Sequence, residues 1–186
     1  MAPFTHILLF FLAATFAVSV SIPLRLSIDD VKTDLSKISD QVTSLNGKIQ
    51  AFPDSGGKLS DALAIHQGAQ DLAKSLDQGT TDVKNTPSVS EFDGEAILDQ
   101  VQGFQPTIIS ALEGIAQKRK AFDSLPVAGI TKLAKQDLAV LSNSTGSFEN
   151  ALIAAAPTDA LKSKAQSVAD SINQAIAKAQ AAYANA

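Results

Sequence analysis

The sequence predicts an all-α fold, a five-helix antiparallel bundle. Five successive stretches carry apolar residues at alternating intervals of three and four, which is the spacing of one face of an α-helix. Short runs that contain Gly, Pro or Asn separate these stretches and stop one helix before the next begins. The clearest stripe consists of Ile28, Val31, Leu35, Ile38, Val42, Leu45, Ile49 and Phe52.

The first two predicted helices are bounded by a capping residue and by turns. The first helix is expected to begin after Ser27, an N-cap with Asp30 three residues later, and to end before the turn at 52–57. The second stripe, whose last turns are weakened by Gly79, consists of Ala62, Ile65, Ala69, Leu72, Leu76 and Val83.

The third predicted helix contains a proline. Ser88 and Glu91 form a capping box that predicts its start. Pro106 lies inside its stripe, removes one helical hydrogen bond and clashes with the preceding turn, so we expect this helix to be kinked or split at Pro106. The stripe consists of Ile97, Val101, Phe104, Ile108, Leu112, Ile115 and Phe122.

The last two predicted helices are separated by a proline. The fourth is expected to begin after 125–127 and to end at Ala156 and Pro157, and Thr158 is the expected N-cap of the fifth. The fourth stripe consists of Ala134, Leu138, Leu141, Thr145, Phe148 and Leu152. The fifth consists of Leu161, Ala165, Val168, Ile172, Ile176, Ala179 and Tyr183.

The composition suits one globular domain with a single core. The chain has 186 residues, of which 45% are hydrophobic and 18% are charged, and it has no cysteine. A chain of this length buries roughly 70% of its unfolded surface, so its core can do without disulfides. Because there is no Trp and only one Tyr, bulky groups are few, and we expect gaps in the packing of that core.

The first residues have the pattern of a secretory signal peptide. An apolar run extends over 7–18, and Ala17 and Ser19 supply small residues at the minus-three and minus-one positions of a cleavage site after Ser19. We therefore expect a signal peptide at 1–19 and one helical domain at 20–186, and a cut after Ser21 fits nearly as well. A membrane-spanning helix would need about 20 apolar residues and would have to cross Pro23, so no integral membrane anchor is expected.

The sequence has no pattern typical of a catalytic or metal site. His66 is the only histidine after the predicted signal peptide, and Ala62 and Gln70, instead of a carboxylate, lie one turn to either side of it. No nucleophile elbow and no metal-binding motif is present. We therefore predict a non-enzymatic protein that uses no metal and no cofactor.

The charge distribution argues against nucleic-acid binding. The formal net charge is −4, whereas binding to phosphate backbones relies on clustered cations. The one basic cluster, at 118–120, is short and is typical of the last turn of a helix, where cations offset the negative end of the helix dipole. A contact of this cluster with an anionic head group stays open as a second interpretation.

Asn143, Ser144 and Thr145 form an acceptor sequon for N-glycosylation. Asn143 falls opposite the apolar row of the fourth predicted helix, so a glycan would fit there. Such triplets also arise by chance, and an unmodified Asn143 stays open.

Several runs of the sequence resemble one family of fungal proteins. The run at 104–112, followed by Ile115, Lys118 and Phe122, is similar to the middle of the fungal hydrophobic surface-binding protein A family, which is related to cell-wall galactomannoproteins. The resemblance spans Asp29 to Tyr183 and includes the run at 30–35 near its start. Its last part consists of the run at 148–152, then Pro157, Leu161, Ala165, Ile172, Ala175 and the closing pair Ala182 and Tyr183.

The resemblance implies a secreted helical bundle that adsorbs to hydrophobic surfaces. In some relatives it implies recruitment of polymer- or lipid-degrading enzymes, and in others an enclosed fatty acid. We therefore expect a protein outside the cell, free or loosely associated with the cell wall, whose partner is a hydrophobic surface or a lipid and, in addition, a secreted hydrolase. The alternative is a structural cell-wall mannoprotein or antigen with a packed core and no ligand.

The candidate ligand-binding residues lie in the central layers of the second to fifth predicted helices, with the first helix closing the side. This hypothesis requires the apolar stripes to face one common axis. The candidates are Leu72, Leu76, Ile97, Val101, Phe104, Ile108, Leu112, Leu138, Leu141, Phe148, Ile172 and Ile176.

Overall fold

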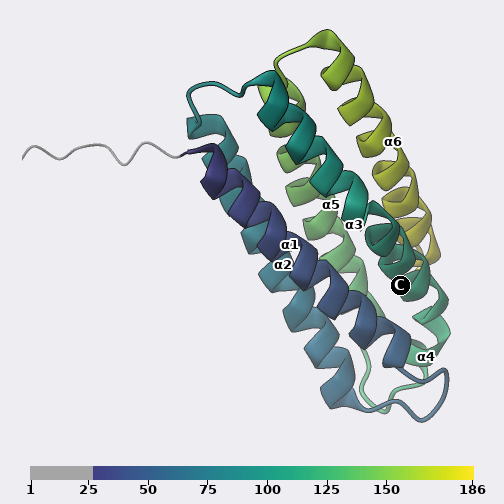
Figure 1. Ribbon diagram of the computed structural model, residues 1–186. Helices are drawn as coiled ribbons and strands as arrows, with labels where there is room; N and C mark the ends of the chain where they lie inside the picture. Colours follow the sequence, from purple (N-terminus) through teal and green to yellow (C-terminus); the bar gives the residue numbers. More distant parts are fainter. Residues whose placement is uncertain (1–26) are drawn as a thin grey trace, which may run out of the picture.

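The computed structural model describes residues 27–186 and forms six α-helices there (Figure 1). The predicted signal peptide at 1–19 lies outside the described residues. Of the helices in this part of the chain, none is long and apolar enough to cross a membrane. The helices are α1 (Ile28–Ala51), α2 (Leu59–Asn85), α3 (Glu91–Gln117), α4 (Arg119–Asp123), α5 (Ile130–Ala155) and α6 (Asp159–Ala182).

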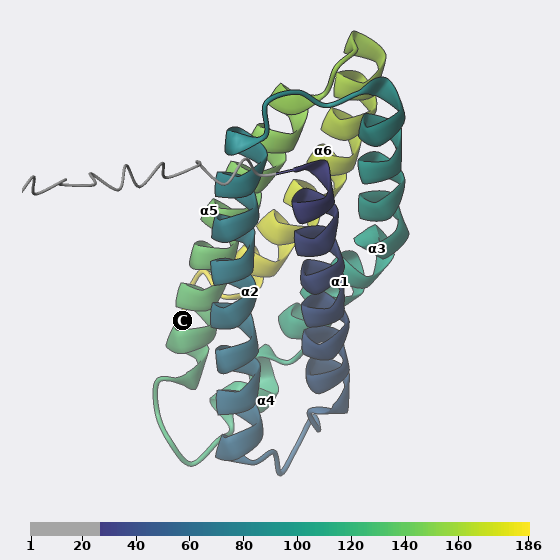
Figure 2. The ribbon, with the colours of Figure 1, turned by 60° about the vertical axis from the view of Figure 1, so that its left-hand side comes forward.

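The five long helices form a closed ring (Figures 1 and 2). Helix α1 packs against α2, α2 against α5, α5 against α6, α6 against α3, and α3 back against α1. Each helix therefore has two main neighbours and turns its apolar stripe toward the axis of the ring. With neighbouring axes about 9 Å apart, the centre of such a ring lies about 7.7 Å from each helix axis, against about 6.4 Å in a four-helix bundle. The centre of a five-helix ring is consequently harder to fill.

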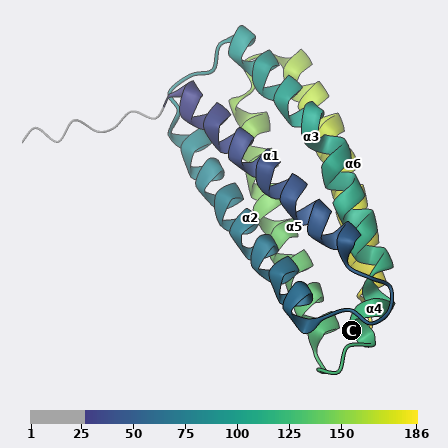
Figure 3. The same cartoon turned by 60° about the horizontal axis from the view of Figure 1, so that its bottom comes forward.

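Successive long helices run in opposite directions, whereas neighbours in the ring do not all do so. Helices α1, α3 and α6 run downward from the end at the top of Figure 1, here called the upper end, and α2 and α5 run back up to it (Figure 3). Three neighbouring pairs, α2 with α5, α3 with α6 and α1 with α3, are therefore parallel. The predicted antiparallel arrangement is correct along the chain but does not describe these three contacts.

Side-chain caps start three of the long helices. Ser27 and Asp30 form the expected capping box at α1, and the Thr158 hydroxyl accepts a hydrogen bond from the backbone N–H of Leu161 at α6. At α3 the predicted cap is wrong, because Ser90, rather than Ser88, accepts from the backbone N–H of Asp93. This later start leaves Val89 in the loop, where its side chain lines the apolar interior.

Helix α3 continues through Pro106, so the prediction of a helix split at this residue is wrong. Phe104 and Ile108, on either side of the proline, both pack in the core, and this packing offsets the loss of one hydrogen bond. A kink at Pro106 is compatible with one continuous helix and stays a prediction. The chain breaks instead at Lys118, and the short α4 that follows makes the predicted count of five helices wrong.

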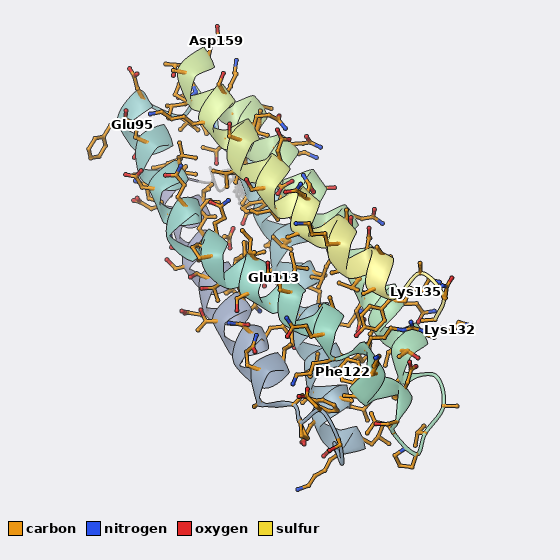
Figure 4. The ribbon with its side chains drawn as sticks, turned by 90° about the vertical axis from the view of Figure 1, so that its right-hand side faces the viewer. Glu95, Glu113, Phe122, Lys132, Lys135 and Asp159 are labelled. Carbon is orange, nitrogen blue, oxygen red and sulfur yellow. The ribbon has the colours of Figure 1, made fainter. Side chains whose placement is uncertain are left out.

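Aromatic side chains close the lower end of the ring. Phe52 and Phe122 meet edge to face with ring centroids 4.8 Å apart, and Figure 4 shows Phe122 at this end. Tyr183 is fully buried, and its hydroxyl donates a hydrogen bond of 2.8 Å to the backbone carbonyl of Ile115. Burial raises the pKa of Tyr183 above its ordinary value, so the hydroxyl keeps its proton. The lower end is thus filled by large, well-fixed rings.

Truncation of Phe52 tests this closure. Phe52→Ala is expected to lower the free energy of unfolding by about 3–5 kcal/mol, because it removes a ring that is 1% exposed and leaves a cavity against Phe122. Urea unfolding followed by circular dichroism measures the change. The matched control is Phe92→Ala, at a ring that is 79% exposed, for which a change within about 0.5 kcal/mol is expected. Equal effects of the two substitutions would contradict the closure.

Candidate functional site

An apolar cavity of about 70 Å³ lies inside the ring near its upper end and is here called the upper cavity. All five long helices line it, through the start of α1, the end of α2, the start of α3, the end of α5 and the first half of α6. Val89 of the α2–α3 loop and Ala156 of the α5–α6 loop also line it. The upper cavity therefore reaches the loops at the end of the ring that lacks the aromatic closure.

Two further cavities follow along the axis toward the lower end. The middle cavity measures about 80 Å³ and is again lined by all five long helices. It shares Val101, Glu149, Leu152 and Ile172 with the upper cavity. The lower cavity measures about 50 Å³ and is lined by α1, α2, α3 and α5. The axis of the ring is thus hollow in three places that follow one another.

Phe148 closely packs α5 against α2 at the level of the middle cavity. The Phe148 side chain is 4% exposed and lines this cavity. A Cβ atom at Gly79 of α2 would lie only 2.9 Å from Cε2 of the Phe148 ring. Gly79, which weakens α2 as a helix former, is therefore the residue that leaves room for this ring.

Glu149 is a polar residue in an otherwise apolar setting. Its Oε2 accepts a hydrogen bond of 2.8 Å from Nδ2 of Asn173 on α6, and its Oε1 is buried without a hydrogen-bond partner among the described residues. Burial raises the pKa of Glu149 to about 7, while the hydrogen bond from Asn173 lowers it and the charge of Asp170 raises it further. Burial therefore favours the protonated form of this carboxyl group more than it would for an exposed glutamate.

The lower cavity contains a different carboxyl group, whose partners are all present. Asp137 is 8% exposed, and both of its oxygens lie 2.9 Å from Nδ1 of His66, while Gln70 Nε2 donates to Oδ1 at 2.8 Å. The sequence shows no carboxylate near His66, but the fold supplies one from α5, 71 residues away. The contact between His66 and Asp137 therefore links α2 to α5.

Each of the three cavities is small. An engineered cavity of about 150 Å³ holds a benzene molecule, and each of the three cavities is about half that size or less. A long acyl chain therefore fits only if neighbouring cavities widen and join.

Comparison with known proteins identifies the family. The family model for hydrophobic surface binding protein A matches residues 28–154, which is more than half of the chain. The chain belongs to this family. The match confirms the family that the sequence resembles.

This member of the hydrophobic surface binding protein A family is similar to a curated protein, cell wall mannoprotein 1 of Aspergillus flavus. The two are 28% identical over 149 residues, which is 80% of this chain and 51% of the relative. The chain therefore spans about half the length of the curated relative that it matches.

Solved structures share the fold. AFMP4P in complex with palmitic acid superimposes with a TM-score of 0.76 at 29% identity, over 84% of this chain and 99% of that chain. Ligand-binding domain 1 of the Penicillium marneffei MP1 protein, complexed with arachidonic acids, gives 0.75 at 20% identity over 84% and 98%. Domain 2 of MP1, complexed with multiple arachidonic acids, gives 0.76 at 20% identity over 86% and 97%. At 20% identity the two MP1 domains show the fold alone.

Eleven of the twelve predicted site residues line the three cavities. Val101 and Ile172 line both the upper and the middle cavity, and Ile97 lines the upper one. Ile176 is buried at 5% exposure but lines none of the three. The middle cavity contains Leu72, Leu76, Phe104, Ile108 and Phe148, and the lower cavity contains Leu112, Leu138 and Leu141.

The sequence hypothesis gave α1 too small a share of the site. Instead of merely closing the side, α1 lines all three cavities, because each helix of a ring faces the axis. Its lining residues are Ile28, Val31, Ile38, Val42, Leu45 and Ile49. Glu149 was also missed, although it lies on the fourth stripe, four residues after Thr145 and three before Leu152. A charged residue on an apolar stripe is the signal that could have found it.

Asn143 lies on α5 and is exposed, as its place opposite the apolar row predicts. Glycosylation of this residue stays a prediction. Thr145, which completes the sequon, lines the middle cavity from the same helix.

Replacement of Glu149 tests the cost of its buried charge. The pKa of this carboxyl group rises from 4.5 to about 7 on folding, so the folded state binds more protons and loses stability as the pH rises from 4.5 through 7. Glu149→Gln is therefore expected to raise the free energy of unfolding at pH 8 by on the order of 1–2 kcal/mol, with solvent screening allowed for, and to change it little at pH 4.

Urea unfolding at the two pH values measures this difference. Glu95→Gln, at an exposed position of α3 (Figure 4), is the matched control and should leave the stability nearly unchanged at both. The same gain for Glu149→Gln at pH 4 and at pH 8 would contradict the assignment.

Proposed function

We propose that this member of the hydrophobic surface binding protein A family binds a long-chain fatty acid, or another lipid with one long acyl chain, along the axis of its helix ring. The observation that carries the proposal is the row of three apolar cavities, two of which are lined by all five long helices. The structure of AFMP4P with palmitic acid, at 29% identity, supports the same class of ligand.

The energetics of burial support binding without a catalytic group. A 16-carbon chain gains roughly 12 kcal/mol when its methylenes leave water, at about 0.8 kcal/mol each. Immobilisation and ordering cost roughly 4–10 kcal/mol, and micromolar affinity requires roughly 8 kcal/mol. Apolar contact therefore reaches micromolar affinity when the ordering cost is low, and a polar contact with the head group would add to it.

The ligand enters from the upper end. The lower end is closed by Phe52, Phe122 and Tyr183, all at most 2% exposed. At the upper end the lining includes loop residues and small side chains such as Ala156, Ala165 and Ala169, which leave more room for a chain to pass. Passage of the ligand then pushes the helices apart and joins the three cavities.

Adsorption to hydrophobic surfaces is a second function, and one exposed side chain favours it. Phe92, in the first turn of α3, is 79% exposed and lies at the upper end of the ring. A bulky ring held in water at the upper end of the ring of helices is suited to contact a wax, a polymer or a lipid phase. The family description, hydrophobic surface binding, agrees with this function.

Secretion is part of the proposal. The signal-peptide pattern and the similarity to a cell wall mannoprotein support a location outside the cell, free or at the wall. Recruitment of a secreted hydrolase stays a prediction that follows from the family resemblance.

A larger side chain at Val101 tests the axial site. Val101 lies where the upper and middle cavities meet, so Val101→Phe is expected to fill this junction and to lower the affinity for palmitic acid at least 10-fold. Native mass spectrometry of delipidated protein, titrated with palmitic acid, measures the bound fraction. Val140→Phe is the control, since Val140 is 40% exposed on the outside of α5. Undiminished binding by Val101→Phe would contradict the axial site, and a wild-type protein that takes up no lipid would favour the structural alternative.

Removal of the Phe92 ring tests surface adsorption. Phe92→Ala is expected to reduce the amount of protein retained on an alkane-coated film several-fold, because the ring supplies exposed apolar area at the upper end. Quartz-crystal microbalance measurements report the adsorbed mass. Leu63→Ala is the control, at a residue that is 44% exposed near the lower end, and should adsorb like the wild type. Equal losses for both variants would rule out a specific role of the upper end.

A further inference from the structure

The upper and middle cavities share one ionisable residue. Of the described side chains that line either cavity, Glu149 alone carries a titratable group, and it lines both. The other polar side chains are the hydroxyl groups of Thr86 in the upper cavity and Thr145 in the middle one. A lipid with a charged head group thus meets a single titratable partner along this part of the axis.

The two oxygens of Glu149 differ in their surroundings. Oε2 accepts a hydrogen bond from the exposed side chain of Asn173 on α6. Oε1 is buried and has no hydrogen-bond partner in the described part of the chain. Leaving a buried polar atom without a partner costs free energy that a bound ligand could recover. Asp137, the carboxyl group of the lower cavity, offers no such position, because His66 and Gln70 already bind it.

We propose that Glu149 is the head-group site of the ring: Oε1 forms a hydrogen bond with the carboxyl group of the bound fatty acid, and the two carboxyl groups share one proton. This inference rests on the proposed function, the binding of a fatty acid along the axis. It adds the chemical class of the head group, a free carboxyl group rather than an ester, and the residue that recognises it.

The position of Glu149 also sets the direction of the acyl chain. Glu149 lies 15 residues along α5 from Ala134 of the lower cavity, which corresponds to about 22 Å along the helix axis. It lies 7 residues from Ala156 of the upper cavity, which corresponds to about 10 Å. A fully extended 16-carbon chain is about 18 Å long, at the roughly 1.2 Å per bond of an extended backbone. With its carboxyl group at Glu149, the chain fits toward the lower end and not toward the upper one.

Sharing a proton makes the binding of a carboxylate depend on pH. Two carboxylates in contact cannot both be ionised in a buried site, so the complex must hold one proton. The groups around Glu149 are Asp170 and Asn173 of α6, and the lining that α1, α2 and α3 contribute carries no charge within the described cavities. The pKa of Glu149 in the folded protein is about 7. Below this pH Glu149 already carries the shared proton, whereas above it the protein must take up a proton when the fatty acid binds.

The test compares palmitic acid with methyl palmitate, titrated into delipidated full-length protein between pH 6 and 8.5. For the wild type, the affinity for palmitic acid is expected to fall about 10-fold per pH unit above pH 7, while the affinity for methyl palmitate stays constant. Glu149→Gln keeps the size and a donor at this position but cannot titrate, so its affinity for palmitic acid should not change with pH. Glu95→Gln, at an exposed residue, should behave like the wild type.

A second variant keeps the test informative if Glu149→Gln folds poorly. Asn173→Ala removes the donor to Oε2, which raises the pKa of Glu149, so the fall in palmitic acid affinity should begin at a higher pH. A wild-type affinity for palmitic acid that is constant with pH, or a slope that persists in Glu149→Gln, overturns the head-group site but leaves the proposed function standing if methyl palmitate binds. Loss of binding for both ligands at every pH overturns the proposed function together with this inference.

Discussion

The constraint on which the structure depends is the closure of five helices into one ring. In a four-helix bundle, side chains from opposite helices meet at the centre, whereas the centre of a five-helix ring is about 1.3 Å farther from each helix axis. Leu, Ile, Val and Phe side chains reach it only in part, and the chain contains no Trp to extend farther. The three hollows along the axis follow from this geometry, and so does the share that every helix has in lining them.

Three carboxyl groups between the helices differ in their hydrogen-bond partners and in whether they line a cavity. Asp137 is bound by His66 and Gln70 and links α2 to α5. Asp34 lies on α1, where burial and the neighbouring carboxyl group of Asp82 raise its pKa to about 6, and it lines none of the three cavities. Glu149 combines burial, one unpartnered oxygen and a place in two cavities. A polar atom left unpaired in this way costs folding free energy, and its place in two cavities is what distinguishes Glu149 from the other unpaired groups.

Periodicity was enough to predict the long helices, and caps predicted the starts of two of them, because both are local properties of the sequence. The stripe of α1 and the caps Ser27 and Thr158 lie where the sequence places them. The order of the helices around the ring is not local, so parallel contacts such as that of α2 with α5 could not be foreseen. The break at Lys118 interrupts an apolar stripe that runs on to Phe122, so the periodicity did not reveal it. The apolar lining followed from the stripes, whereas the pairing of His66 with Asp137 required the fold.

The aromatic closure of the lower end leaves the upper end as the entrance of the proposed axial site. A molecule held inside leaves by the opening through which it arrived, and the part that went in first comes out last. Exchange of the bound lipid then depends on the helix ends and loops at the upper end. Substitutions elsewhere on the outer surface are expected to alter solubility or glycosylation without altering the rate of exchange. Under the proposed function, a bound lipid is released only where the upper end faces the acceptor, so release depends on the orientation of the protein at a surface.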